Sequence, residues 1–403
     1  MKTRVAVIFG GKSVEHEVSI ISGLQAFAAL DREKYEAVPL YIAKDGKWYT
    51  GEHMGDIESY KDMNASLKTA VRVVPASGEN GGADLLRWPP KRFGSHVAGG
   101  FDVALPVVHG TNVEDGALSG FLETLGVPYA ACDVTASALG MDKYQMKGAL
   151  RQAGVPVLDA VLFTGREYTA EPEKIEEKVE AVCPYPVIVK PVNLGSSVGI
   201  SRAGDREELK AAVDEALSYS GRILVERAVP HLREINCAVL GDYDTAEASV
   251  CEEPLGAGDI LSYQDKYMRG GASKGGKTGA PDGKTGGMSG LTRRLPADIP
   301  DELAERVREL AVATFRALNC LGVARIDFLN DRESGELWVN EINTIPGSLA
   351  FYLWEAAGVP FSALLDRMIE AAFKRQRERE ALTFSYDTNL LAGITLGGAK
   401  AGK

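Results

Sequence analysis

The feature of this sequence that most restricts its fold is a strand–helix–strand pattern at the start. A short apolar run, residues 4–9 (RVAVIF), ends at Gly10-Gly11, and a helical pattern covers residues 14–30 before a second apolar run at 37–43. Short apolar runs joined by a helix are typical of a β-α-β unit, whose two strands lie parallel. We therefore expect an α/β protein that begins with a parallel sheet.

The same alternation continues along the chain and predicts three α/β units. Further strands are expected at 101–108, 157–163, 186–192, 222–226, 235–240, 323–329 and 337–342, and helices at 115–125, 143–152, 172–182, 206–218, 300–318 and 361–375. The length of 403 residues suits two or three domains of about 150 residues. Residues 45–100 are less periodic and should extend one edge of the first sheet. The polar, then glycine-rich tail after Glu380 should be loosely held.

The charge and the cysteines exclude several classes of function. The counts of 45 Lys and Arg against 56 Asp and Glu give a net charge of −11, which argues against a general nucleic-acid-binding protein because such proteins need a basic surface. No window approaches the ~20 apolar residues of a membrane helix, and the first apolar run is shorter than that of a secretory signal. The five cysteines are odd in number and lack C-x-x-C spacing, so we expect reduced, buried thiols in a cytoplasmic protein.

A glycine-rich segment interrupts the last unit. Nine of the 44 glycines fall within residues 270–290, and such a composition predicts a loop that acts as a lid. Residues 271–278 (GASKGGKT) match the P-loop pattern G-x-x-x-x-G-K-[ST], but Gly279-Ala280-Pro281 follows, where the required helix cannot begin. We therefore reject the P-loop interpretation and expect a flexible, basic lid.

The strongest chemical signal lies between residues 325 and 347. Asp327 lies on one expected strand, and Glu341 and Asn343 end the next. Because Glu341 and Asn343 are two residues apart on a strand, they share one face, and Asp327 can face them if the strands are hairpin neighbours. Three oxygen ligands without His or Cys suit Mg²⁺. A polar cluster at a sheet end is the alternative, but carboxylates in apolar strands are costly unless paired or metal-bound, so we favour metal.

Two lysines and a loop of small residues predict a site for nucleotide phosphates. Lys190 lies within the apolar run PVIVKPV, where an ammonium group needs an anionic partner, and Lys143 begins an expected helix. The loop at 195–199 (GSSVG), which includes Ser196 and Ser197, offers backbone N–H groups suited to the close approach of phosphate. Each lysine alone is also compatible with a side chain that reaches solvent.

Other polar side chains follow expected strands. Glu15 opens the first helix and His109 follows a strand; because α/β proteins bind ligands at the carboxyl ends of parallel strands, Glu15 could hold a substrate ammonium group and His109 could contact substrate. A glutamate that only complements the helix dipole and a structural histidine are the alternatives. Glu226, with Arg227 and Val229, ends another strand and belongs either to a hinge that reads adenine and ribose or to a domain edge.

Together these features resemble the D-alanine–D-alanine ligases of the ATP-grasp superfamily. The matching motifs are VAVIFGGKSVEHEVSIISG, HGTNVEDGALSGFLETLGVPYA, ALGMDKYQMK, YPVIVKPVNLGSSVGIS, YQDKYM, GVARIDFL and VNEINTIPGS, which run in the family's order from residue 3 to about residue 375. The resemblance implies a three-domain ATP-grasp fold: an N-terminal parallel-sheet domain at 1–131, a central ATP-grasp subdomain at 132–229, a C-terminal ATP-grasp subdomain at 230–380 with a mobile lid at 262–292, and a tail at 381–403.

The resemblance also implies roles for individual residues. ATP would be held by Lys143, Lys190, Ser197, Glu226, Arg227, Val229, Glu234 and Lys266, and two Mg²⁺ ions, for which Mn²⁺ could substitute, by Asp327, Glu341 and Asn343. Glu15, Ser196 and Tyr267 match a hydrogen-bonded trio that links the first-substrate site to the lid, and Arg325 and the backbone N–H of Gly347 match an oxyanion-stabilising pair. Substrate contacts would come from His109, Val18, Ser348 and Leu349.

The implied reaction is the ATP-dependent ligation of two D-alanine molecules. ATP phosphorylates one carboxylate, and the amine of the second D-alanine attacks the acyl phosphate, which gives D-alanyl-D-alanine, ADP and phosphate for peptidoglycan synthesis. A lid must exclude water because the acyl phosphate would otherwise hydrolyse. The family further implies a homodimer with small-molecule substrates and no nucleic-acid or membrane partner.

Three departures from the family pattern leave alternatives open. The lid is expanded at 270–290, Val113 stands where the family often has glycine, and the link after Pro346-Gly347 is shorter than usual. Since that link normally helps to build the second-substrate pocket, a related ligase that uses D-serine, D-lactate or another acceptor is the main alternative. Tyr267 favours an amino acid over a hydroxy acid, because ligases that form the depsipeptide generally lack it. A nucleotide-binding regulatory protein without ligation activity is disfavoured by the intact set of Lys190, Arg325, Asp327, Glu341 and Asn343.

Overall fold

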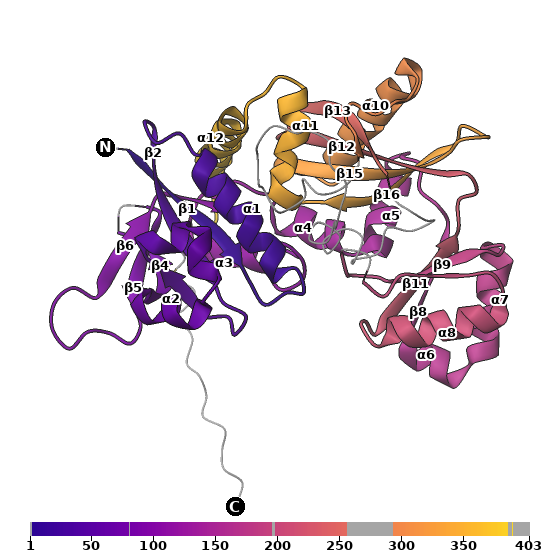
Figure 1. Ribbon diagram of the computed structural model, residues 1–403, viewed down its shortest axis with the longest axis horizontal. Coiled ribbons are helices and arrows are strands. Elements are labelled where there is room, and N and C mark those ends of the chain that lie inside the picture. Colours follow the sequence, from indigo (N-terminus) through magenta and orange to yellow (C-terminus); the bar gives the residue numbers. More distant parts are fainter. Residues whose placement is uncertain (1, 80, 196–197, 256–292, 386–388, 390–403) are drawn as a thin grey trace, which may run out of the picture.

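The computed structural model describes residues 2–79, 81–195, 198–255, 293–385 and 389. Figure 1 shows an N-terminal unit in indigo and violet at the left, a central unit in magenta at the lower right, and a C-terminal unit in orange at the upper right. Among the described residues no single helix is long and apolar enough to cross a membrane, although one bent pair, Gly347–Ala356 with Phe361–Glu380, passes by length and composition.

A seven-stranded sheet in the order β6-β5-β4-β3-β2-β1-β7 forms the N-terminal unit. The strands are β1 (Thr3–Gly10), β2 (Tyr35–Ile42), β3 (Trp48–Thr50), β4 (Val71–Ser77), β5 (Ala83–Arg87), β6 (Val97–Phe101) and β7 (Val103–Pro106). β1 lies parallel to β2 and β7, whereas β3 to β6 add antiparallel at the β2 edge. The expected parallel strands therefore form one end of a mixed sheet, and residues 45–100 extend the sheet from β2 as expected.

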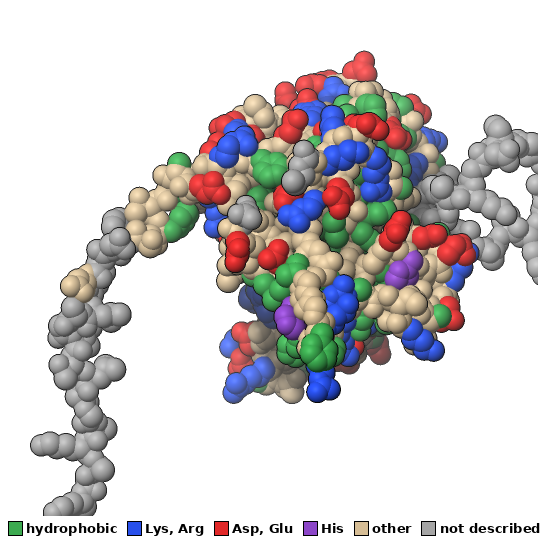
Figure 2. All heavy atoms as spheres, turned by 90° about the vertical axis from the view of Figure 1, so that its left-hand side faces the viewer, with side chains coloured by type: hydrophobic (Ala, Val, Ile, Leu, Met, Phe, Trp, Pro, Cys, Tyr) green, Lys and Arg blue, Asp and Glu red, His purple; other side chains and the backbone are tan. Residues whose placement is uncertain are grey.

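The helices of this unit include α1 (His16–Ala29), α2 (Met63–Thr69) and α3 (Ala117–Leu125), with short 3₁₀ turns η1 (Glu52–Gly55) and η2 (Ile57–Tyr60). Gly23 of α1 lies directly over Phe9 of β1, and a Cβ at this position would come within 2.4 Å of the Phe9 side chain. The absence of a side chain there lets α1 lie close to the sheet. Figure 2 shows this end of the molecule, where acidic and basic side chains are interspersed.

The last long helix of the chain completes the N-terminal core. α12 (Phe361–Glu380) buries Leu364, Leu365, Met368, Ile369 and Ala372 in the same apolar cluster as the residues of β1. Arg375 of α12 donates hydrogen bonds to the carbonyls of Tyr129 at 2.7 Å and Ala131 at 3.1 Å. A helix from the end of the sequence is therefore part of the first unit.

The central unit is a four-stranded antiparallel sheet in the order β10-β9-β11-β8. Its elements are β8 (Ala160–Thr164), α6 (Gly165–Ala170), α7 (Pro172–Val182), β9 (Val187–Pro191), β10 (Ser201–Ala203), α8 (Arg206–Leu217) and β11 (Arg222–Arg227). Residues of α7 and α8 form one buried apolar cluster with the four strands. Lys190 on β9 pairs with Leu224 on β11, so the strand order brings Lys190 next to Glu226.

The C-terminal unit is a five-stranded antiparallel sheet in the order β14-β13-β12-β15-β16. Its elements are β12 (Leu232–Gly241), β13 (Ala246–Pro254), β14 (Arg293–Arg294), α10 (Asp301–Ala317), β15 (Gly322–Asp331), β16 (Leu337–Asn343), the 3₁₀ turn η5 (Gly347–Ala350) and α11 (Phe351–Ala356). Two helices that precede the central unit, α4 (Val134–Met141) and α5 (Lys143–Gln152), place Ala136, Met146 and Leu150 in the core of this sheet.

The start of α5 is fixed by its cap. Asp142 accepts hydrogen bonds from the backbone N–H groups of Tyr144 at 3.1 Å and Gln145 at 3.0 Å, and such a cap satisfies N–H groups that have no partner within the helix. The Arg222 side chain pairs with the other oxygen of Asp142 at 2.5 Å. Lys143, the first residue of α5, is thereby held where the central and C-terminal units meet.

Candidate active site

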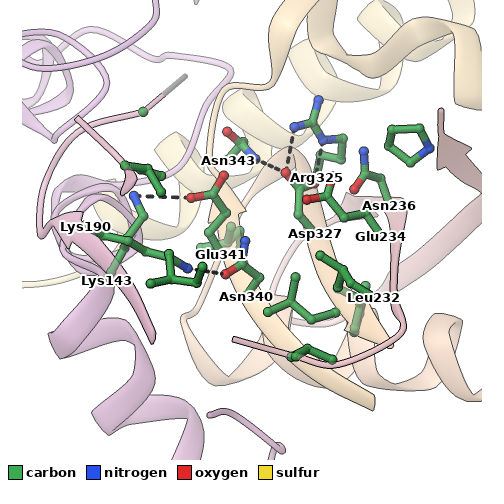
Figure 3. A pocket seen from close by; sticks show the side chains of 18 of the residues that line it. Lys143, Lys190, Leu232, Glu234, Asn236, Arg325, Asp327, Asn340, Glu341 and Asn343 are labelled. Carbon is green, nitrogen blue, oxygen red and sulfur yellow. Dashed lines mark hydrogen bonds and ion pairs between the residues drawn. The ribbon is translucent and has the colours of Figure 1, made fainter. Parts of the chain in front are cut away.

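A cavity of about 1050 Å³ is lined by residues of all three units. The N-terminal unit contributes Glu15, Val18 and His109, and the central and C-terminal parts of the chain contribute Lys143, Lys190, Glu226, Arg227, Val229, Glu234, Arg325, Asp327, Glu341, Asn343 and Gly347. Figure 3 shows the lysines on one side of this cavity and the polar side chains of the C-terminal sheet on the other. The structure therefore brings together most of the site residues expected from the sequence.

The carboxylate pair expected on the hairpin is present. Asp327 of β15 lies opposite Glu341 of β16, and Arg325 lies opposite Asn343. The Arg325 guanidinium donates to both oxygens of Asp327, at 2.7 and 2.8 Å, and the Asn343 amide donates to Asp327 Oδ2 at 3.1 Å. Burial opposes the charge of Arg325, but the adjacent Asp327 holds its pKa well above the ordinary value. A buried, bidentate ion pair thus fixes both side chains at the cavity wall.

The donor set of this hairpin fits a hard divalent cation. Asp327 and Glu341 offer carboxylate oxygens, and Asn343 keeps its amide oxygen available for a ligand while its nitrogen contacts Asp327. Oxygen donors in this number suit Mg²⁺, which keeps several waters and binds through one or two carboxylates and substrate phosphates. The described residues contain no group of three His, Cys, Asp or Glu that could hold a metal, so the candidate set rests on two carboxylates and one amide.

A cluster of lysines lies across the cavity from the sheet. Lys143 Nζ donates to the carbonyl of Leu194 at 2.6 Å and lies 3.2 Å from Glu341 Oε2. Lys190 Nζ pairs with Glu226 and donates to Asn340 Oδ1 at 3.0 Å. Figure 3 shows both lysines pointing toward the end of β16. These ammonium groups place positive charge beside the candidate metal ligands, where phosphate oxygens would need it.

A third lysine, Lys147, was not expected from the sequence. Its Nζ lies 2.9 Å from Glu226 Oε2, and both side chains are almost fully buried. Within the described residues this ion pair is the main polar contact of both atoms. Lys147 is one helical turn after Lys143, and this i,i+4 spacing was a signal that the two lysines share a face.

The pairing of Glu226 changes its expected role. Its carboxylate is turned toward Lys147 and Lys190, and only 1% of the residue is exposed. The side chain is therefore occupied by lysines instead of being presented to a ribose. Glu234, on β12, also lines the cavity. Together with Arg227 and Val229, Glu234 remains a predicted contact of the adenine and ribose of ATP.

His109, at the N-terminal end of the cavity, is held by hydrogen bonds to two other segments of the chain. Its Nδ1 lies 2.9 Å from the carbonyl of Ile345, to which it must donate, so Nε2 accepts from the Ser22 hydroxyl at 3.0 Å. Burial lowers the pKa of His109 to about 4. His109 is therefore neutral near pH 7, and its contact with the first substrate remains a prediction.

Ser348 and Leu349 do not reach the cavity. The Ser348 backbone N–H donates to the Ser22 hydroxyl at 2.9 Å, and its side chain donates to Gln25 Oε1 at 2.6 Å. Both residues are buried, Leu349 in the N-terminal core, whereas Gly347 and Tyr352 line the cavity wall. The short link turns these two side chains against α1, and their contact with substrate remains a prediction.

Two family models cover most of the chain. The model described as D-ala D-ala ligase N-terminus matches residues 4–132, and the model described as D-ala D-ala ligase C-terminus matches residues 149–370. The chain belongs to the D-alanine–D-alanine ligase family. The resemblance inferred from the seven motifs is thereby confirmed, together with the expected ATP-grasp type of α/β fold.

Curated members of the ligase family match over nearly their full length. A D-alanine–D-alanine ligase of Thermosipho melanesiensis is 37% identical over 388 residues, which cover 96% of this chain and 98% of that one. The enzyme of Chlorobium limicola is 39% identical and covers 92% of this chain and 97% of its own. Among solved structures, the D-alanine–D-alanine ligase of Coxiella burnetii superposes with a TM-score of 0.77 at 30% identity, over 94% of this chain and 96% of that chain. The VanG D-Ala:D-Ser ligase of Enterococcus faecalis gives 0.73 at 29% identity, over 92% and 100%.

Some residues predicted from the family lie outside the described part of the chain. They are Ser196, Ser197, Lys266 and Tyr267, together with the whole lid predicted at 262–292. Their roles remain predictions.

Glu114 was missed by the sequence reasoning; it accepts hydrogen bonds from the backbone N–H groups of Gly110 at 2.9 Å and Ile345 at 3.0 Å. Burial and the charge of Glu15 raise the pKa of Glu114 to about 8. Its signal was its position four residues after Gly110, at the same junction between a strand and a helix as His109.

The low pKa of His109 predicts how stability depends on pH. Burial lowers the pKa of His109 to about 4 from its ordinary value of 6.5, so between these values the unfolded chain binds more protons than the native state. The free energy of unfolding should therefore fall as the pH falls from about 6.5 to 4, with up to ~1.4 kcal/mol per pH unit from this residue. Denaturant titrations over this range should show a shallower pH dependence for His109→Gln. Identical pH profiles would contradict the assignment.

Proposed function

We propose that this chain is an ATP-dependent ligase that joins two D-alanine molecules to give D-alanyl-D-alanine, ADP and phosphate. The observation that supports this most directly is the meeting, in one cavity, of the Lys143–Lys190 cluster with the hairpin that carries Arg325, Asp327 and Glu341. Membership of a family whose curated relatives are named for this reaction points the same way. The reaction requires ATP and a divalent metal. The finer proposal is two Mg²⁺ ions, which Mn²⁺ can replace.

Different residues of the cavity bind the phosphates and the metal during phosphoryl transfer. Lys143 and Lys190 bind phosphate oxygens of ATP, while Asp327, Glu341 and Asn343 hold the metal. A metal held by these residues would supply positive charge against the phosphoryl group that is transferred. These positive groups lie against a hairpin whose strands are otherwise buried, and a low-dielectric surrounding makes their electrostatic effect larger than in water.

The second step is attack of an amine on the acyl phosphate. Arg325, held by Asp327, and the backbone N–H of Gly347 stabilise the oxyanion of the tetrahedral intermediate. Glu15 and His109 lie at the N-terminal end of the same cavity, where they position the first D-alanine. Ser196 and Tyr267 complete this arrangement in our proposal. The product enters peptidoglycan synthesis in the cytoplasm, and the enzyme works as a homodimer.

One observation favours a second candidate, a ligase with a different acceptor such as D-serine. The two link residues expected to shape the acceptor pocket, Ser348 and Leu349, are turned away from the cavity. A product assay separates the candidates: ATP, Mg²⁺ and D-alanine are incubated with and without D-serine, D-lactate or L-alanine, and the products are identified by mass. D-alanyl-D-alanine as the main product supports the first candidate, and a mixed product that dominates in the presence of D-alanine supports the second.

Replacing Glu341 with glutamine should weaken metal binding. The change removes one of the two carboxylates while it keeps the size of the side chain, and the 3.2 Å ion pair with Lys143 is lost as well. Mutating a residue that only hydrogen-bonds to a metal ligand typically lowers metal affinity or activity 10–100-fold. Loss of the charge of a ligand itself should therefore raise the Mg²⁺ concentration for half-maximal activity by at least about tenfold. Activity is measured against Mg²⁺ concentration. Wild-type activity at low Mg²⁺ would refute the ligand assignment.

A further inference from the structure

A row of polar side chains extends across the C-terminal sheet beyond the candidate metal ligands. Asn236 of β12 lies opposite Asp327 of β15 on one side and opposite Glu252 of β13 on the other. With Glu341, these residues span four neighbouring strands at one level of the sheet. Asn236, Glu252 and Asp327 all line the cavity. The cavity therefore continues past Arg325 to a region that neither ATP nor the metal accounts for.

Tyr352 of α11 forms the wall of this region. Its hydroxyl donates to Glu252 Oε1 at 2.8 Å, and the Asn236 amide donates to the same oxygen at 3.0 Å. The Arg293 guanidinium lies 4.2 Å from the centre of the Tyr352 ring and 3.2 Å from Glu252 Oε2. A hydrogen bond at one end and a cation over the ring face thus fix the ring in one orientation. A fixed aromatic ring defines the size of the space beside it.

The position of this wall relative to Arg325 identifies what it faces. Tyr352 and Glu252 line the same cavity as Arg325, and Asn236, which contacts Glu252, lies opposite Asp327, two residues after Arg325. In the proposed reaction, Arg325 contacts the carbonyl oxygen that is attacked. Phosphate lies on the side of Lys143 and Lys190, and the first amino acid lies on the side of Glu15 and His109. The remaining side, toward Tyr352, is the direction from which the attacking amine can approach.

We propose that Tyr352 is the residue that determines which acceptor this ligase takes, because its ring limits the size of the acceptor side chain and Glu252 positions that ring. The inference rests on the proposed function and adds the acceptor class: a small D-amino acid, with D-alanine favoured over D-amino acids with branched side chains. It also explains how the chain keeps an acceptor pocket although Ser348 and Leu349 are turned away. The helix that follows the short link supplies the wall instead.

The test measures competition between acceptors. Wild-type protein and the variants Tyr352→Ala, Tyr352→Leu and Tyr352→Phe are each incubated with ATP, Mg²⁺, D-alanine and either D-2-aminobutyrate or D-valine, and the dipeptides are quantified by mass. Since a missing or added methylene in an apolar pocket changes selectivity by roughly 10–200-fold, Tyr352→Ala should raise the yield of D-alanyl-D-valine relative to D-alanyl-D-alanine by on the order of tenfold or more. Tyr352→Leu should show a smaller increase, and Tyr352→Phe, which keeps the ring but loses its hydrogen bond to Glu252, should show the smallest increase of the three.

Two further variants separate a specific effect from a general one. Glu252→Gln, which weakens the anchor of the ring, should shift the product ratio in the same direction as Tyr352→Leu. Tyr243→Ala is the matched control, because Tyr243 is a partly exposed tyrosine at the far end of the same sheet, and it should leave the product ratio unchanged. A folded, active Tyr352→Ala or Tyr352→Leu variant with the wild-type product ratio would overturn the inference alone. Wild-type protein that forms no D-alanyl-D-alanine would overturn the proposed function and, with it, this inference.

Discussion

A Glu226→Gln variant should lose roughly 3–5 kcal/mol of the free energy of unfolding, the cost of breaking a buried ion pair by removing one partner. The Glu226 carboxylate lies between the ammonium groups of Lys147 and Lys190 in the interior of the protein. Burial alone would raise the pKa of Glu226, but the charges of the two lysines lower it to about 2. Glutamine would leave two buried cations without the carboxylate between them. Denaturant unfolding at pH 7 measures the loss.

The same pair makes further variants informative. Lys147→Met leaves Glu226 with one lysine and should cost less than Glu226→Gln. The double variant Glu226→Gln/Lys147→Met leaves one buried cation in place of two and should recover part of the loss. Glu171→Gln is the matched control, because Glu171 forms an exposed ion pair with Lys174, and exposed pairs contribute at most about 1 kcal/mol. Equal losses in Glu226→Gln and Glu171→Gln would contradict the buried-pair account.

The stabilisation by Glu226 should also depend on pH. Because the folded-state pKa lies near 2, below the ordinary value of 4.5, the stabilisation is fully present above the ordinary value and is lost as the pH falls toward 2. Over the same range the glutamine variant has no carboxylate to protonate. The difference in unfolding free energy between the two proteins should therefore shrink on acidification.

An Arg325→Met variant should lower kcat by on the order of 10²–10³-fold, the usual loss when one group that stabilises a developing negative charge is removed. Methionine keeps an unbranched side chain of similar reach but has no charge. Asp327, which receives two hydrogen bonds from Arg325, would also lose the partner that orients it. Steady-state turnover with D-alanine and ATP measures the effect.

An Arg325→Lys variant tests whether charge or geometry matters. Lysine restores the charge but cannot form the two parallel hydrogen bonds to Asp327, so we expect kcat to recover only in part. Circular dichroism and thermal unfolding should show that both variants are folded. A kcat within a factor of two or three of the wild type in Arg325→Met would refute the proposed role in stabilising the oxyanion.

Much of the fold was predictable because local apolar patterns coincide with the elements. The helices expected at 143–152 and 172–182 have those bounds in the structure, and their apolar residues recur at helical spacing. β13 was not predicted. It carries adjacent acidic residues, Glu252 and Glu253, which in sequence resemble a solvent-exposed loop. Both are buried because Arg293 and Arg294, 41 residues later, pair with them, and no local pattern reveals so distant a partner.

The candidate site likewise has a part that could be predicted from local sequence patterns and a part that could not. Asp327, Glu341 and Asn343 were predictable from strand spacing alone, since a hairpin puts residues two apart on one face. The direction of the link after Gly347 was not. Ser348, Leu349 and Ala350 all have positive φ angles, 51°, 55° and 49°, a conformation that residues other than glycine rarely adopt. A sequence without glycine at these positions gives no sign of such a turn, and the turn is what removes Ser348 and Leu349 from the cavity.

The contribution of α12 to the first core has a consequence for how the protein is made. Residues near both ends of the sequence, Val5 and Leu364 among them, share one apolar cluster. The ribosome releases the N-terminal unit long before α12. The apolar surface of this unit that α12 covers therefore stays exposed on the nascent chain until α12 has been made. A fragment of residues 1–131 should accordingly be degraded by protease much faster than the same segment in the full chain, and equal resistance would refute this reasoning. The substrate cavity, whose floor depends on that unit, can close only after α12 has been made, so chains that stop before α12 cannot begin catalysis early.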